Sequence, residues 1–154
     1  MMASEEKKLV SKSSELPSGI LFVEDNEDHF VLARHQLRKL KITNHAARVT
    51  TVDEMVAYLG GAGVYGDRTK YPLPTVIFLD LRLPQRGGLE AQAWLRSKLK
   101  YRNIPIVVIS TPDMVTMLES AVRLGANARM TKPFNGQEFL RVVLEQKLPV
   151  TFAD

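Results

Sequence analysis

The stretch TVIFLDLRLPQRGG, residues 75–88, places an apolar and partly β-branched run directly before a carboxylate, Asp80. The run from Val76 to Leu79 predicts a short strand that is buried on both faces, as in a parallel sheet. Pro84 is expected to stop regular structure soon afterwards. An ionised aspartate among apolar residues is unfavourable unless a cation pairs with it. We therefore expect another part of the chain to supply that cation.

The rest of the chain alternates strand-like and helical patterns around this stretch. Short apolar runs predict five strands, at residues 20–23, 45–49, 76–79, 104–109 and 128–131. Apolar residues at helical spacing predict five helices, over residues 30–40, 52–59, 89–99, 114–124 and 138–146. Either Asn26 or Asp28 is expected to cap the first helix. The alternation predicts an α/β fold in which helices cover both faces of a parallel sheet.

Length and composition limit the class of protein. A chain of 154 residues with 45% hydrophobic and 25% charged residues is typical of one ordinary globular domain. No apolar run approaches the roughly 20 residues needed to cross a bilayer, so no membrane association is expected. The absence of cysteine excludes disulfides and thiolate metal sites, and fits a cytoplasmic protein. We interpret residues 1–17 as a disordered leader, 18–148 as one domain and 149–154 as a short tail.

The net charge of +4 raises the question of nucleic-acid binding. The basic residues of the domain are dispersed along the chain, at Arg34, Arg38, Lys39, Lys41, Arg96, Lys98, Lys100 and Arg102. Dispersed charges of this kind are usual on solvated helix faces. No direct nucleic-acid binding is therefore expected.

Polar residues stand at the ends of the predicted strands. Glu24 and Asp25 follow the first strand, Asp80 ends the third, Ser110 ends the fourth and Lys132 follows the fifth. The carboxyl ends of parallel strands meet at one edge of a sheet, so these groups should converge. One lysine cannot neutralise three carboxylates. A hard divalent cation with oxygen ligands, Mg²⁺ above all, would balance the remaining charge.

Taken singly, each of these residues has an ordinary structural interpretation. Asp80 could cap a turn before Pro84, Glu24 and Asp25 could cap the following helix, and Lys132 could be an exposed lysine. Their convergence from four strand ends favours a functional site instead.

The stretches ILFVEDNED, FLDLRLPQRGGLE, IPIVVIS, LGANA and TKPF resemble the receiver domain of two-component response regulators. The resemblance covers about residues 18–148, and its motifs occur in order at the predicted strand ends. The VEDN opening and the long tyrosine-bearing loop at residues 60–74 are similar to stand-alone receivers associated with phytochromes and other histidine kinases. The resemblance implies a flavodoxin-like fold, a doubly wound five-stranded parallel sheet with five helices.

The resemblance also implies roles for three side chains. Asp80 would be the phosphoacceptor, taking a phosphoryl group from a sensor histidine kinase or a phosphotransfer protein. Lys132 would pair with the Asp80 carboxylate before transfer and with a phosphoryl oxygen afterwards. Ser110 would donate a hydrogen bond to the phosphoryl group.

The same resemblance implies a Mg²⁺ site. Asp25 and Asp80 would ligate the ion directly, Glu24 would act through a bound water, and the backbone carbonyl of Arg82 would complete the protein ligands. The histidines show no metal-ligand spacing and are predicted to lie at the surface: His29, His35 and His45.

Four positions depart from the usual receiver pattern. Arg129 stands where receivers commonly carry an aromatic switch residue, three positions before the lysine. Arg82 occupies the second position after the acceptor, Pro112 the second after Ser110, and Gly87 replaces a common aspartate. None of these changes removes a residue needed for metal binding or phosphorylation.

The sequence therefore predicts a signalling module, not an enzyme with a separate substrate. No output domain is expected, so its effect would run through a partner protein or through homodimerisation at the fourth helix, fifth strand and fifth helix. One alternative is an aspartyl phosphatase of the haloacid dehalogenase class, but that class places a second acid where this chain has Arg82. A second alternative is a degenerate receiver that binds partners without phosphorylation, an interpretation that Arg129 keeps open.

Overall fold

The computed structural model of the protein describes residues 19–83 and 87–154. The predicted leader at 1–17 and the predicted stop at Pro84 lie outside the described residues.

Strands and helices alternate along the described chain, as predicted. The strands are β1 (Gly19–Val23), β2 (His45–Val49), β3 (Pro74–Asp80), β4 (Ile106–Ser110) and β5 (Ala128–Thr131). The α-helices are α2 (Glu27–Lys39), α3 (Val52–Gly60), α4 (Gly88–Ser97), α5 (Val115–Arg123) and α6 (Gly136–Gln146). Two strands differ from the prediction by two residues at their starts: β4 begins later, after Pro105, which has no N–H to donate to a strand ladder, and β3 begins earlier, at Pro74.

The five strands form one parallel sheet in the order β2-β1-β3-β4-β5. This is the flavodoxin-like order, and it confirms the predicted fold. From β1, the chain first adds β2 on one side and then adds β3, β4 and β5 on the other. The strand order therefore reverses between β1 and β3. In sheets of this kind, ligands bind beyond the carboxyl ends of the strands at that reversal.

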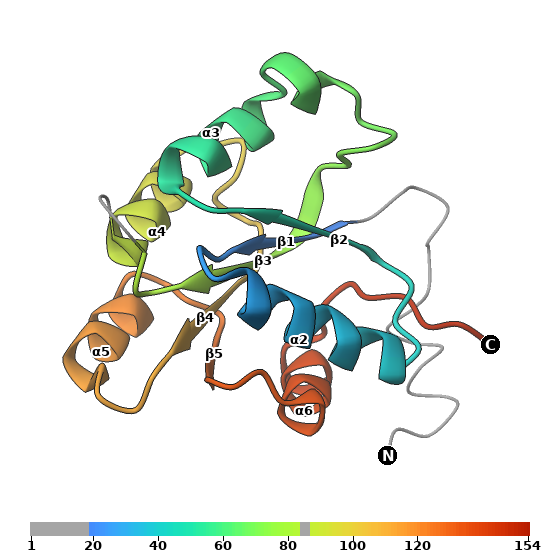
Figure 1. Cartoon of the computed structure of the whole chain (residues 1–154). Coiled ribbons are helices and arrows are strands. Elements are labelled where there is room, and N and C mark those ends of the chain that lie inside the picture. Colours follow the sequence, from blue (N-terminus) through green and yellow to red (C-terminus); the bar gives the residue numbers. More distant parts are fainter. Residues whose placement is uncertain (1–18, 84–86) are drawn as a thin grey trace.

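Helices cover both faces of the sheet (Figure 1). Alternate residues of each strand point to opposite faces, so β1 contributes Ile20 and Phe22 to one core and Leu21 and Val23 to the other. The first core is completed by α2 and α6, and the second by α3, α4 and α5. Burial on both sides holds β1 and β3 rigidly, which fixes the residues that follow them.

Local interactions fix the first residues of α2 and α4, which lie beside the carboxyl ends of the strands. Asn26 caps α2, because its side chain accepts a hydrogen bond from the backbone N–H of His29 at 3.0 Å. At the start of α4, a Cβ on Gly88 would lie 2.6 Å from the carbonyl oxygen of Asp80. Only glycine permits this approach, which brings α4 against the end of β3.

The predicted tail at 149–154 is docked on the domain. Val150 is fully buried, and Phe152 forms an antiparallel bridge with Ile42 in the connection between α2 and β2. The backbone N–H of Thr151 donates to the side chain of Asn44 at 2.7 Å. The segment therefore contributes to the core on the α2 and α6 side.

The long connection before β3 is compact. It contains a short 3₁₀ helix, Gly63–Gly66, and Arg68 donates to the carbonyl oxygens of Tyr58, Leu59 and Tyr71. The bonds to Tyr58 and Leu59 satisfy carbonyl oxygens at the end of α3, and the bond to Tyr71 ties the connection to it. No helix among the described residues is long and apolar enough to span a membrane.

Candidate functional site

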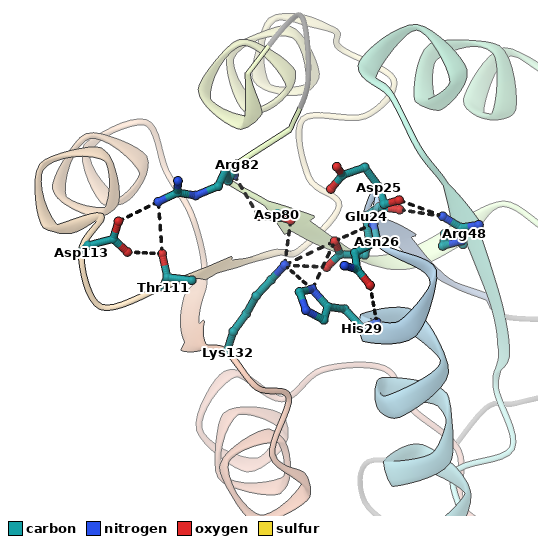
Figure 2. Close-up of polar contacts among 10 residues, drawn as sticks. All are labelled: Glu24, Asp25, Asn26, His29, Arg48, Asp80, Arg82, Thr111, Asp113 and Lys132. Atoms are coloured by element: carbon teal, nitrogen blue, oxygen red, sulfur yellow. Dashed lines mark hydrogen bonds and ion pairs between the residues drawn. The ribbon is translucent and has the colours of Figure 1, made fainter.

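Three carboxylates converge where β1 and β3 end (Figure 2). Glu24 follows β1 directly and Asp80 is the last residue of β3, and their side chains are only 7% and 3% exposed. Asp25 is exposed beside them. One oxygen from each of the three carboxylates lies within 4.8 Å of the other two. The predicted convergence of these acids is therefore present in the structure.

Lys132, just after β5, supplies the cation expected for Asp80. Its ammonium nitrogen lies 2.9 Å from Oδ2 of Asp80 and 3.0 Å from Oε1 of Glu24. Burial disfavours the charged lysine, but its hydrogen bonds and attraction to the two acids prevail and raise its pKa above the usual 10.5. Lys132 is thus held as a cation between two buried carboxylates.

The pKa of Glu24 is raised by its surroundings in this cluster of charges. Burial and the nearby charge of Asp80 raise the pKa of Glu24 to about 7, although the hydrogen bond from Lys132 acts in the opposite direction. A single ammonium therefore does not balance the acids at this edge of the sheet.

Glu24 leads to a specific pH dependence of stability in the metal-free protein. Its pKa is raised from 4.5 to about 7 on folding, so its contribution to the free energy of unfolding is fully present below about pH 4.5 and is lost as the pH rises through about 7. Urea titrations in EDTA should show this decline, and Glu24→Gln should lack it. The shifted pKa values of Lys132 and Asp113 lie outside this window. An unchanged slope in Glu24→Gln would contradict the assignment.

Backbone groups around the carboxylates are fixed by further hydrogen bonds. Arg48 of β2 donates to the carbonyl oxygens of Glu24 and Asp25, at 3.2 and 3.4 Å. The backbone N–H of Arg82 donates to Oδ1 of Asp80 at 2.8 Å, which orients that carboxylate. The donor set is made of oxygens, some in buried carboxylates, and this chemistry fits a hard divalent cation such as Mg²⁺.

Ser110 lies at the end of β4, in the same buried edge. It is 1% exposed, and its hydroxyl has no hydrogen-bond partner among the residues that the structure describes. Buried hydroxyls are nearly always paired, because an unpaired one loses its hydration without compensation. The position therefore suits a hydroxyl that donates a hydrogen bond to a bound ligand.

The Arg82 side chain turns away from Asp80 and crosses to the loop after β4 (Figure 2). Its guanidinium lies 2.8 Å from Oδ2 of Asp113 and 3.4 Å from the hydroxyl of Thr111, which also hydrogen-bonds to Asp113. The pKa of Asp113 is lowered by its hydrogen bonds, that from Thr111 first. Arg82 thus bridges the loops after β3 and β4. Arg129, which stands at the position of the usual aromatic switch residue, is exposed on β5.

Sequence reasoning missed three participants in this region: His29, Asp113 and Arg48, which donates to the carbonyl oxygens of Glu24 and Asp25. His29 lies at the surface as predicted, with its side chain 47% exposed, but its ring contacts Lys132. Nothing in the sequence singles out Asp113, although it holds Arg82. The available signal for His29 was its place in the first turn of the helix that follows Glu24 and Asp25, because that turn lies at the carboxyl edge.

The fold and site together define a class: a doubly wound α/β domain with a buried acid cluster and a lysine at the reversal of strand order. The family model of the response regulator receiver domain matches residues 20–144. The chain belongs to this family, as its motifs predicted.

Similar proteins include response regulator Rcp1 and several phytochrome response regulators. Response regulator Rcp1 of Synechocystis is 28% identical in sequence, and the match covers 87% of this chain and 89% of Rcp1. The structure of the Mn²⁺-bound form of Rcp1 has a TM-score of 0.69 at 27% identity, and the match covers 90% of this chain and 100% of that one. The bacteriophytochrome response regulator AtBRR is 30% identical with a TM-score of 0.76, over 90% of this chain and 97% of that one. The phosphorylated cyanobacterial phytochrome response regulator RcpA is 28% identical with a TM-score of 0.69, and the match covers 84% of this chain and 91% of that one.

Proposed function

We propose that this protein is a phosphorylation-controlled signalling module. It accepts a phosphoryl group on Asp80, with Mg²⁺, from the histidine of a sensor kinase or phosphotransfer protein. The observation that carries the proposal is the buried Asp80 carboxylate, which faces Lys132 at 2.9 Å and lies in the same buried strand edge as the hydroxyl of Ser110, unpaired among the described residues. The phosphorylated structure of RcpA and the Mn²⁺-bound structure of Rcp1 support the proposal by similarity.

The proposed reaction needs positioning and charge neutralisation more than covalent assistance. Asp25, Asp80 and the backbone carbonyl of Arg82 would hold Mg²⁺, with Glu24 acting through a water, and the ion would supply charge that neutralises the phosphoryl oxygens. An Asp80 oxygen bonds to phosphorus as the bond from phosphorus to the donor nitrogen breaks, and that electron pair returns to the imidazole. Lys132 leaves the carboxylate to bind a phosphoryl oxygen, and the hydroxyl of Ser110 donates a hydrogen bond to another.

Phosphoryl uptake from a small donor tests this function directly. Wild-type protein incubated with acetyl phosphate and Mg²⁺ should gain one phosphoryl group, detected by intact mass. Borohydride reduction of the acyl phosphate followed by peptide mapping should place it at residue 80. No uptake, or a different mapped residue, would refute the proposal.

The output of the module is proposed to run through protein contacts in the cytoplasm. The surface formed by α5, β5 and α6 exposes apolar side chains of α5, with Val115 59% and Val122 49% exposed. A partner protein or a second copy of the chain would contact this surface. The intact acids and Lys132 argue against a degenerate receiver.

The bridge made by Arg82 is expected to lengthen the life of the phosphorylated state. Because it joins the loop that follows Asp80 to the loop after β4, it restricts a water from reaching phosphorus in line with the Asp80 bond. Arg82→Ala should lose phosphate roughly tenfold faster, if the barrier falls by about 1.4 kcal/mol. The measurement is phosphate release from isolated phosphoprotein in Mg²⁺.

Asp113→Asn separates the steric effect of Arg82 from its charge. This change frees the guanidinium without removing it, so steric cover predicts faster phosphate loss here too. Slower loss in Arg82→Ala would instead mean that the arginine stabilises the charge of the transition state. Stability should change little in either variant, because the two side chains are 63% and 68% exposed.

A further inference from the structure

His29 has no part in the proposed reaction, yet its ring lies against the lysine of the site (Figure 2). Nδ1 of His29 is 2.9 Å from the ammonium nitrogen of Lys132. An ammonium group can only donate hydrogen bonds, so Nδ1 is the acceptor and the ring proton resides on Nε2. The imidazole is therefore a neutral partner of the cation.

This contact completes the hydrogen bonding of Lys132. A lysine ammonium has three N–H donors. In the structure, Lys132 has three acceptor residues: Asp80 at 2.9 Å, Glu24 through Oε2 at 3.3 Å and His29 at 2.9 Å. Two of these partners are acids of the cluster, and only the third lies outside it.

The helix start determines where the His29 ring can be. Asn26 accepts the backbone N–H of His29 at 3.0 Å, which fixes His29 in the first turn of α2. The side chain then extends from α2 toward Lys132, across a separation of 103 residues in the chain. The ring is half exposed and lies at the rim of the site, while the lysine side chain beneath it is 15% exposed.

We propose that His29 is a positioning residue that holds Lys132 while the other partners of this lysine change; the inference rests on the proposed function. A bound cation would engage Glu24 through a water, and phosphorylation would convert the Asp80 carboxylate into an acyl phosphate. His29 is the acceptor that remains the same throughout. Being neutral, it restrains the ammonium without adding negative charge to a site that already holds three carboxylates.

Two substitutions of His29 test the acceptor itself. His29→Leu removes it, whereas His29→Asn places an amide oxygen close to the position of Nδ1. At saturating Mg²⁺ the Leu variant should be phosphorylated by acetyl phosphate roughly tenfold more slowly, because a charge-assisted hydrogen bond that orients Lys132 is lost. The Asn variant should stay within about threefold of wild type.

A matched control and a binding measurement exclude a general structural effect. His35→Leu makes the same change on an exposed residue of α2 and should leave the rate at the wild-type level. Mg²⁺ affinity of His29→Leu, measured by calorimetry, should also be unchanged, since the proposed metal ligands are intact. Rescue by Asn together with unchanged Mg²⁺ affinity supports positioning of the lysine.

Either of two results would overturn the role of His29: a wild-type rate in His29→Leu, or an equally slow rate in His29→Asn. In both cases wild type and His35→Leu still take up the phosphoryl group, so the proposed function survives. If wild type and His35→Leu take up none, the proposed function itself fails, and the role of His29 fails with it.

Discussion

Asp80→Asn should abolish phosphoryl uptake while the protein remains folded. The amide has nearly the same shape as the carboxylate, so packing at the end of β3 is preserved, but it lacks the nucleophilic oxygen that would bond to phosphorus. Incubation with acetyl phosphate and Mg²⁺, followed by intact mass measurement, should show modification of wild type and none of the variant. The expected effect is all or none.

The matched control for this change is Asp113→Asn. Asp113 is an exposed aspartate on the neighbouring loop, paired with Arg82, and its substitution should still permit phosphoryl uptake, although the phosphate is expected to be lost faster afterwards. Modification that survives in Asp80→Asn would show that another side chain is the acceptor. Loss of uptake in both variants would point to an effect of charge near the site and not to the identity of Asp80.

Lys132→Met should weaken both stability and phosphorylation. The substitution leaves the carboxylates of Glu24 and Asp80 buried without their cation. Breaking a buried ion pair in this way typically destabilises a protein by about 3–5 kcal/mol. Loss of a charged donor to the phosphoryl group should also slow phosphorylation by about 10²–10³-fold.

The loss of stability in Lys132→Met should depend on pH. Because the pKa of Glu24 is already about 7 beside the lysine, this carboxyl can take up a proton in mildly acidic solution and so relieve the repulsion. Urea titrations in EDTA should therefore show a larger deficit at about pH 8 than at about pH 5. Added Mg²⁺ should recover part of the loss, since it binds only the folded chain.

Lys70→Met provides a control for the removal of a lysine. Lys70 is exposed and lies in the connection before β3, away from the acid cluster. Its substitution should change stability by less than about 0.5 kcal/mol. Equal stability of Lys132→Met and Lys70→Met at about pH 8 would mean that the buried acids do not depend on their lysine for neutralisation.

The sequence by itself determined the order of strands and helices and the edge at which the acids gather. These features depend on local patterns: the apolar run before Asp80 predicts β3 without knowledge of its neighbours, and parallel strands bring their carboxyl ends to one edge. Asp80, Glu24 and Asp25 could therefore be placed together from the sequence alone. The convergence of Lys132 on these acids followed from its place after the fifth strand, whereas its pairing with Asp80 was implied by the resemblance to receiver domains.

Only the tertiary structure decided where the remaining side chains of the site point. His29 meets Lys132 across 103 residues, and Arg82 meets Asp113 across 31, so neither contact leaves a periodic signal in the sequence. The raised pKa of Glu24 depends on burial by surrounding elements and on the distance to Asp80. Side-chain direction and burial arise from packing between distant elements, and patterns of near neighbours along the chain do not record them.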